Sequence, residues 1–298
     1  MATENMYTPQ DPNKQYPGPP FKAQQQEAPG TIHDMDPQPD HGETSYTGSG
    51  RLIGRKAIVT GADSGIGRAV AIAFAREGAD VAINFLPEEA EQAQEVADLI
   101  TAAGSKVAVI PGDLKNEAFN AELVEKAVQQ LGGVDVLAFV AGTMPTIKSI
   151  ADFETSTFDD ILKTNLYSLF WTTKAALPHL KPGASIVTTS SQQGFRASPQ
   201  LAEYAVSKAG IVNWTRAMSA QLIEKGIRVN GVAPGPVWTP LQPSFVPNEK
   251  LENFGSESPM GRPAQPAELA PAFVFLASQE SSYVTGETIA VTGGTPLH

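Results

Sequence analysis

The sequence predicts an α/β protein built on one doubly wound parallel sheet, with an extended arm before it. Two observations carry this prediction. From Arg51 onward, short runs rich in Val, Ile and Ala, which suit strands buried on both faces, alternate with segments of helical character. Before Arg51 the chain is polar and rich in proline, and it shows no such alternation. We therefore expect an arm over residues 1–50 and a single domain over residues 51–298.

The alternation gives the elements in order. Strands are expected at residues 56–60, 80–85, 106–110, 134–140, 185–189, 228–233 and 288–292. Helices are expected at residues 67–78, 88–103, 116–131, 157–180, 202–222 and 266–278. Pro87 suits the start of the second helix, because the first helical turn has no use for a backbone N–H group.

The composition of residues 1–50 predicts that this segment forms no core of its own. Proline and glutamine recur through it, and it ends in Gly48-Ser49-Gly50. Such a segment should be extended or a solvated tail. Its aromatic residues leave a second interpretation open, in which they anchor the arm on a neighbouring subunit: Tyr7, Tyr16, Phe21 and Tyr46.

Charge and residue counts exclude several classes of function. With 21 Lys+Arg against 32 Asp+Glu, the net charge of -11 argues against nucleic acid or an anionic membrane as partner. There is no cysteine, and the four histidines are scattered, so we expect no disulfide, no thiol nucleophile and no metal site. No apolar run is long enough to span a membrane, and the first residues lack the apolar core of a signal peptide. A cytoplasmic protein is expected.

Tyr204 and Lys208 form a Y-x-x-x-K pattern in the helix expected at 202–222, so both side chains should lie on one face, one turn apart. An ammonium group beside a phenol favours the phenolate and should lower the tyrosine pKa from its reference of about 10. Such a tyrosine can exchange a proton with a carbonyl or carbinol oxygen. Ser191, at the end of a strand, could hold the same oxygen, although Ser190 competes for this role.

The turn after the first strand carries a glycine cluster, T-G-A-D-S-G-I-G, over residues 60–67. Glycines at a strand–helix turn let the backbone approach a pyrophosphate, and the start of the helix attracts its charge. The nucleotide ribose should then meet the end of the second strand, at Asn84. Because neither a carboxylate nor an arginine stands there, the choice between NAD and NADP stays open.

Taken together, these motifs resemble the short-chain dehydrogenase/reductase family, whose members have a Rossmann-type fold. The resemblance rests on T-G-x-x-x-G-I-G, Asn165, Ser191, Tyr204-x-x-x-Lys208 and Pro234-Gly235 in this order, and it covers residues 51–298. The details F-V-A-G, S-S-Q-Q-G-F and S-Q-E-S-S-Y-V-T-G are similar to one branch. That branch contains bacterial stress-associated oxidoreductases and NADP-dependent aldehyde reductases, and it is similar also to glucose and ribitol dehydrogenases.

The resemblance implies a role for each matching residue. Tyr204 would be the acid/base, assisted by Lys208, with Ser191 orienting the carbonyl group and Asn165 holding a water of the proton relay. The cofactor would contact the residues of the glycine turn and of four later segments, with Lys208 bonding the nicotinamide ribose: Gly61, Ser64, Gly65, Ile66, Gly67, Asp113, Leu114, Ala141, Gly142, Tyr204, Lys208, Pro234, Gly235, Val237 and Thr239. In the family, F-V-A-G at 139–142 is frequently N-N-A-G, so we expect altered local packing there.

The sequence thus predicts hydride transfer between NAD or NADP and an aldehyde or ketone. Oxidation of a sugar or polyol, a non-catalytic nucleotide sensor and an interaction protein acting through its arm remain alternatives. Substrate choice is expected to rest on a lid at 238–261, whose apolar residues either face the substrate or merely cover the core: Trp238, Leu241, Phe245, Val246, Leu251, Phe254 and Met260. The helices at 157–180 and 202–222 are apolar on more than one face, which predicts a homotetramer formed through them, as is common in the family.

Overall fold

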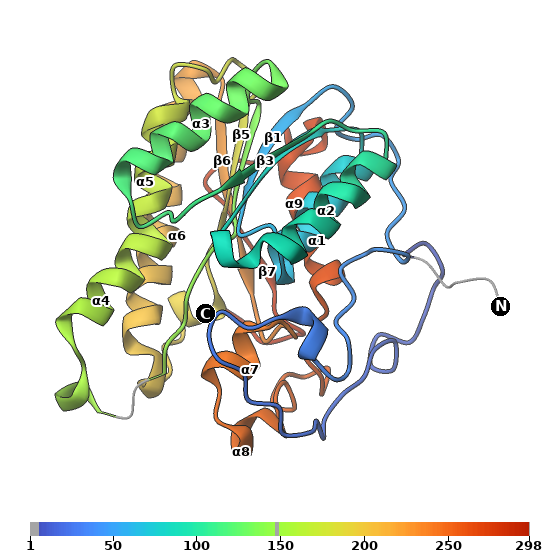
Figure 1. Cartoon of the computed structure of the whole chain (residues 1–298), viewed down its shortest axis with the longest axis vertical. Coiled ribbons are helices and arrows are strands. Elements are labelled where there is room, and N and C mark those ends of the chain that lie inside the picture. Colours follow the sequence, from blue (N-terminus) through green and yellow to red (C-terminus); the bar gives the residue numbers. More distant parts are fainter. Residues whose placement is uncertain (1–5, 147–148, 298) are drawn as a thin grey trace.

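The computed structural model describes residues 6–146 and 149–297, and within them seven strands form one parallel sheet (Figure 1). The strands are β1 (Lys56–Thr60), β2 (Asp80–Phe85), β3 (Val107–Pro111), β4 (Val136–Phe139), β5 (Ser185–Thr189), β6 (Arg228–Pro234) and β7 (Thr288–Val291). They lie in the order β3-β2-β1-β4-β5-β6-β7, and every neighbouring pair is parallel. The predicted doubly wound sheet is confirmed.

Helices cover both faces of the sheet (Figure 1). One face carries α1 (Gly65–Arg76), α2 (Ala90–Ala102) and α9 (Pro266–Ala277); the other carries α3 (Glu117–Leu131), α5 (Ser168–Ala176) and α6 (Ala202–Leu222). Successive side chains of β1 show why both faces need cover. Ala57 and Val59 belong to the core under α1 and α9, whereas Ile58 belongs to the core under α3 and α5. Strands that are apolar on both faces therefore require two layers of helices.

The order of the strands reverses at β1. The chain runs from β1 outward to β2 and β3, and then returns to pair β4 with the other edge of β1. At such a switch point the two crossing connections leave on opposite faces, which opens a crevice at the carboxyl ends of the strands. The fold therefore places a ligand site at the ends of β1 and β4.

The helix expected at 157–180 is composed of three parts. α4 (Thr155–Leu162) leads into a π-helical turn, Lys163–Tyr167, which is followed by α5. In this turn the Ser168 N–H group donates to the Lys163 carbonyl oxygen, five residues back. Turns of this kind occur frequently at functional sites.

The arm is extended, but the expectation of a solvated tail is wrong. Phe21 and Tyr46 are only 6% and 4% exposed, because they pack against the domain of their own chain. The Tyr46 hydroxyl donates to the buried Glu77 carboxylate at 2.7 Å. The arm runs alongside the short helices α7 (Leu241–Phe245) and α8 (Asn248–Leu251) (Figure 1). A segment too polar for a core of its own thus contributes to the core of the domain.

Candidate active site

The glycine turn between β1 and α1 leaves no room for side chains at two of its positions. A Cβ atom at Gly61 would lie 2.8 Å from the Ala141 Cα atom, and one at Gly67 would lie 1.8 Å from the Gly61 carbonyl oxygen. Gly61 also has a φ of 61°, in the left-handed region that favours glycine. The bare backbone of this turn and the start of α1 therefore face the crevice, as binding of a pyrophosphate requires.

A cavity of about 580 Å³ extends from this turn along the carboxyl edge of the sheet. Many of the residues predicted to contact a cofactor line it together: Gly61, Ser64, Gly65, Ile66, Gly67, Asn84, Asp113, Leu114, Ala141, Gly142 and Thr239. Its volume is typical of sites for small ligands and cofactors. The fold thus brings segments that are far apart in sequence to one cavity.

Five predicted cofactor residues lie outside the wall of this cavity: Tyr204 and Lys208 on α6, and Pro234, Gly235 and Val237 at and just after the end of β6. Gly235 packs on β7, because a Cβ atom there would lie 2.8 Å from the Thr292 Cα atom. Val237 is buried and forms a bridge with Ala264. Thr239, two residues further, reaches the cavity and would lie 3.2 Å from a Cβ atom at Gly65.

One end of the cavity is acidic, which the sequence reasoning missed. Asp63, Glu88 and Glu89 line it, and the Oδ2 atom of Asp63, which is 2% exposed, has no hydrogen-bond partner among the described residues. Burial, followed by the neighbouring Asp63, raises the pKa of Glu89 to about 8, and burial raises the pKa of Asp63. The sequence does contain a sign of this acidic end: Asp63 stands within the glycine turn, and Glu88 and Glu89 follow shortly after β2.

Asn84 uses its side chain to hold the neighbouring loop. Its Nδ2 group donates to the carbonyl oxygens of Ile110 and Gly112, at 3.3 and 3.1 Å. Lys115 is the basic side chain lining the described part of the cavity, and it is already paired with Asp160 at 3.3 Å. Arg68, behind the cavity wall, opposes the rise of the Asp63 pKa, but it is itself paired with Glu43 and Glu95.

Tyr204 and Lys208 lie one turn apart on α6, as predicted. The Lys208 Nζ atom is 5.4 Å from the centroid of the Tyr204 ring and donates to the Thr189 carbonyl oxygen at 2.9 Å. Lys208 is 3% exposed, whereas Tyr204 is half-buried. The end of β5 thus holds the ammonium group beside the phenol.

The expected lowering of the tyrosine pKa is not found in the protein alone. Burial raises the pKa of Tyr204 to about 12, and a hydrogen bond with Ser191 opposes the rise. Burial also lowers the pKa of Lys208 to about 8. A site shielded from water disfavours the charged forms of both groups.

The two candidate serines are distinguished by their partners. The Ser190 hydroxyl donates to the Lys208 carbonyl oxygen at 2.9 Å, so it is engaged in holding α6 against β5. The Ser191 hydroxyl accepts from the Gln193 N–H group at 3.1 Å and faces Tyr204. In the protein alone, its proton is donated toward the Tyr204 oxygen.

Asn165, in the π-helical turn, connects this group to the cavity. Its Oδ1 atom accepts from the Thr143 N–H group at 2.9 Å, and its Nδ2 group donates to the Ser207 hydroxyl at 3.0 Å. A Cβ atom at Gly142 would lie 3.4 Å from Asn165 Oδ1 and 3.5 Å from Lys208 Nζ. Asn165 and Lys208 therefore stand directly behind the Gly142 wall of the cavity.

The segment between β4 and α4 departs from the family pattern, as noted above. The Thr60 hydroxyl accepts from the N–H groups of Val140 and Ala141, at 3.0 and 3.2 Å. The Thr189 hydroxyl donates to the Phe139 carbonyl oxygen. The hydroxyl groups of Thr60 and Thr189, at the ends of β1 and β5, thus hold this wall where the family pattern has its two asparagines.

The expected lid divides into two parts. Leu241 and Phe245 line the cavity. Trp238 and Leu251 are fully buried away from it, against Phe21 of the arm, and Val246 and Phe254 pack on the same cluster. Of the two interpretations left open, cover of a core holds for these four residues, and contact with the cavity holds for Leu241 and Phe245.

The parallel sheet, the cavity at its switch point and the tyrosine–lysine pair beside it define a class, the dinucleotide-dependent oxidoreductases. Comparison with known proteins gives the family. Residues 61–296 match the family described as enoyl-(acyl carrier protein) reductase, so this chain belongs to the short-chain dehydrogenase/reductases. It is an NAD(P)-dependent oxidoreductase.

Relatives extend over nearly the whole chain. The uncharacterized oxidoreductase YhxD of Bacillus subtilis is 53% identical, over 93% of this chain and 94% of its own. The uncharacterized oxidoreductase YghA of Escherichia coli is 52% identical, over 96% and 98%. The glucose and ribitol dehydrogenase of Daucus carota is 41% identical, over 92% of this chain and 96% of its own. The NADPH-dependent aldehyde reductase 1 of Arabidopsis thaliana is 40% identical, over 92% of this chain and 97% of its own.

Solved structures agree with the fold. A short-chain dehydrogenase from Burkholderia cenocepacia in complex with NADP has a TM-score of 0.77 and 31% identity. The similarity covers 82% of this chain and 98% of that one. No helix among the described residues is long and apolar enough to cross a membrane.

Proposed function

We propose that this protein reduces an aldehyde or ketone, with Tyr204 as the proton donor. The observation that supports this most is the placement of Tyr204 beside both Ser191 and Lys208, whose Nζ atom lies behind the Gly142 wall of the cavity. A raised pKa keeps Tyr204 protonated at neutral pH, which suits a group that must donate a proton. In this reaction the phenol protonates the carbonyl oxygen as the carbon accepts a hydride.

The other three residues support this transfer. Ser191 donates a hydrogen bond to the same carbonyl oxygen and so orients it. Lys208, held by Thr189, stabilises the phenolate that the transfer leaves behind. Asn165 fixes the segment at Thr143 and carries the water through which the proton is replaced.

The residues present fit a nicotinamide dinucleotide, which supplies or accepts the hydride when bound. The Gly61 and Gly67 positions admit no side chain, so their backbone can approach a pyrophosphate, and Ser64, Gly65 and Ile66 complete the turn. The unpartnered Asp63 oxygen can accept a hydrogen bond from a ribose hydroxyl. At the other walls, contacts are expected from Asn84, Asp113, Leu114, Ala141, Gly142, Pro234, Gly235, Val237 and Thr239.

The substrate is proposed to lie between Tyr204 and the apolar side chains of Leu241 and Phe245. These side chains favour an aldehyde or ketone with an apolar part, and the name of the Arabidopsis relative supports an aldehyde. The name of the Daucus relative supports the second candidate, oxidation of a sugar or polyol through the same residues run in reverse.

The test is a matrix of NADPH and NADH, each with aldehydes, ketones and polyols, followed by absorbance of the reduced nicotinamide. Aldehyde-dependent loss of absorbance is expected. Gain of absorbance with NAD and a polyol alone would support the second candidate. If a dinucleotide binds and none of these compounds turns over, the proposal is wrong and a nucleotide sensor takes its place.

We also propose a homotetramer formed through α5 and α6. Phe170 and Val206, on these two helices, are 50% and 54% exposed. Exposed apolar side chains that gather on one surface are typical of an interface with another chain. Sedimentation of the parent chain is expected to give the mass of four chains, and Phe170→Glu should dissociate it. A monomeric parent chain at micromolar concentration would refute this assembly.

A further inference from the structure

We propose that the N-terminal arm is a positioning element of the active site, with Phe21 as its main anchor. On this view the arm holds the segment at residues 238–254, here called the substrate loop, in its closed position over the cavity. It also supplies part of the cavity wall. Only the effect of the closed loop on binding of the carbonyl substrate rests on the function proposed above.

The strongest contact is an aromatic stack between arm and loop. The rings of Phe21 and Trp238 are 4.2 Å apart at an interplanar angle of 19°. With Met35 of the arm and Leu251 of the loop they form a separate buried cluster, outside the two cores of the sheet. Because the substrate loop has no other apolar cluster of this kind among the described residues, its outer side is held by the arm.

Hydrogen bonds follow the same interface along the chain. The Phe21 N–H group donates to the Glu252 carbonyl oxygen at 2.9 Å, and the Gln26 N–H group donates to that of Pro243 at 3.0 Å. The Trp238 Nε1 group donates to the Pro37 carbonyl oxygen at 2.8 Å. Contacts at both ends and at the middle of the loop fix its position, not merely one point on it.

The arm is anchored equally well on the cofactor side of the domain. The buried N–H group of Ile32 donates to Gln92 Oε1 on α2 at 2.9 Å. Arg68 on α1 donates to the arm carboxylate of Glu43 at 3.0 Å. The arm therefore bridges the substrate loop to the helices that flank the glycine turn, and it can resist movement of one against the other.

Between these two anchorages the arm enters the cavity itself. Ala28, Pro29 and Gly30 line the same cavity as the glycine turn and as Leu241. The approach is close, since a Cβ atom at Gly30 would lie 2.6 Å from the Ser244 hydroxyl and 3.1 Å from the Pro240 carbonyl oxygen. The arm thus supplies part of the wall of the cavity that the glycine turn also lines.

A loop that is closed for only part of the time binds its ligand more weakly by that fraction. Removing the Phe21 ring should therefore raise the KM for the carbonyl substrate by about tenfold if one molecule in ten keeps the loop closed. The kcat value should change less, because Phe21 touches neither Tyr204 nor Lys208. Opening of the loop should also be visible without any substrate.

The experiment compares the full-length variants Phe21→Ala and Lys22→Ala. Lys22 is the adjacent residue, and its ion pair with Asp36 lies in solvent. Hydrogen exchange of residues 238–254 and the KM for the carbonyl substrate are measured on both. Phe21→Ala should speed exchange in the loop and raise KM, with the strands of the sheet unchanged, whereas Lys22→Ala should resemble the parent.

Unchanged loop exchange in Phe21→Ala would overturn the inference, whatever the enzyme turns over. If Phe21→Ala does not fold, Phe21→Leu keeps the apolar volume without the stack, and it should give an intermediate increase in exchange. Loop exchange equal to the parent in that variant would equally overturn the inference. Since exchange needs no substrate, failure of the proposed reduction would leave this outcome readable.

Discussion

The Lys208 ammonium group is held by the Thr189 carbonyl oxygen at 2.9 Å, at the end of the strand whose continuation carries Ser191. This contact ties the helix with the tyrosine–lysine pair to the strand end with the serine. The relative position of the three side chains is therefore set by one junction between β5 and α6. A proton donor and an orienting hydroxyl fixed in this way need little rearrangement when a substrate arrives.

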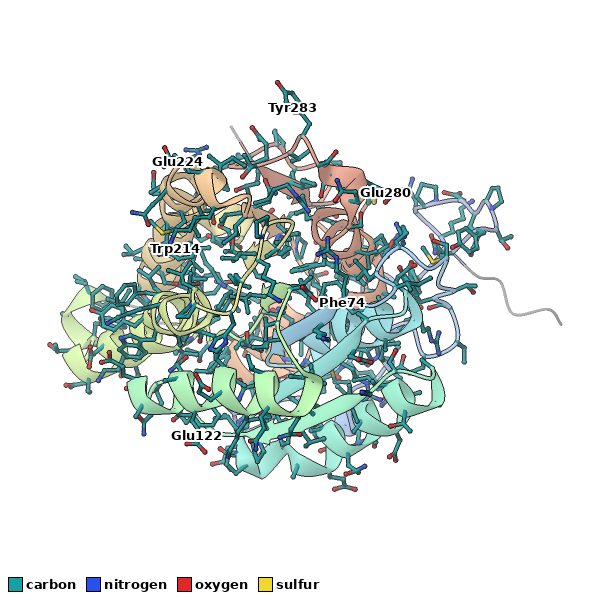
Figure 2. The ribbon with its side chains drawn as sticks, turned by 90° about the horizontal axis from the view of Figure 1, so that it is seen from above. Phe74, Glu122, Trp214, Glu224, Glu280 and Tyr283 are labelled. Carbon is teal, nitrogen blue, oxygen red and sulfur yellow. The ribbon has the colours of Figure 1, made fainter. Side chains whose placement is uncertain are left out.

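Tyr204→Phe removes the proposed proton donor and should lower kcat by about 10²- to 10⁴-fold. Binding of the dinucleotide, followed by its fluorescence, should change little because the ring itself remains. Tyr283→Phe is the matched control, since Tyr283 is fully exposed and points away from the domain (Figure 2). Near-parental turnover in Tyr204→Phe would remove this residue from the mechanism.

The strands and the glycine turn could be predicted because their causes are local. Alternation of Ala57, Ile58 and Val59 between two cores leaves a continuous apolar run that is visible in sequence. The crowding at Gly61 and Gly67 is likewise visible in the sequence, because only glycine fits at these two positions. In such cases the residue type alone indicates whether the position is buried or crowded.

The remaining features depend on partners that are distant in sequence. Phe21 and Trp238 are more than two hundred residues apart, and neither shows by itself that the other is its partner. The carboxylates of Asp63 and Glu89 become close neighbours only when β1 and β2 pair. The Tyr204 pKa depends on how fully water is excluded, which the Y-x-x-x-K spacing does not reveal.

Lys208→Met should stabilise the fold while it impairs catalysis. Burial lowers the Lys208 pKa from 10.5 to about 8, so below pH 8 the folded chain carries a buried charge at a cost of about 3 kcal/mol. Between pH 8 and 10.5 the unfolded chain binds more protons, so the free energy of unfolding of the parent rises with pH there. In the variant this rise should be absent.

Denaturant unfolding of the parent and Lys208→Met at pH 7 and pH 10 measures this difference. Lys126→Met serves as the control, since Lys126 forms an exposed helical ion pair with Glu122. An equal or lower free energy of unfolding for Lys208→Met at pH 7 would show that the lysine charge is compensated inside the site.

Glu89→Gln should increase the use of NADPH relative to NADH. A 2′-phosphate near the acidic end of the cavity would meet the charges of Asp63, Glu88 and Glu89, and like charges in such proximity disfavour binding. Because the Glu89 pKa is raised to about 8, its charge grows as the pH rises through 8. The parent should therefore discriminate against NADPH more strongly at pH 9 than at pH 7.

The ratio of kcat/KM values for NADPH and NADH is the measurement, and an increase of about tenfold at pH 9 is expected for Glu89→Gln. Glu91→Gln is the control, since Glu91 is exposed on α2 and does not line the cavity. A ratio that neither pH nor Glu89→Gln alters would place the 2′ position of the ribose away from this carboxylate.

Gly61→Ala should abolish dinucleotide binding through a steric collision. The same substitution at a second glycine, Gly104, separates the effect of the collision from the effect of backbone strain. Gly61 and Gly104 both have a left-handed φ, 61° and 85°, so alanine is strained at either position by about 1 kcal/mol. Only at Gly61 does the added Cβ atom meet another group, the Ala141 Cα atom at 2.8 Å, whereas nothing lies within 4 Å at Gly104. Calorimetric titration with the dinucleotide should therefore show parental affinity for Gly104→Ala and no binding for Gly61→Ala. Equal affinities in two folded variants would mean that the turn can move away from β4, and that the bare backbone at Gly61 is not required for the cofactor.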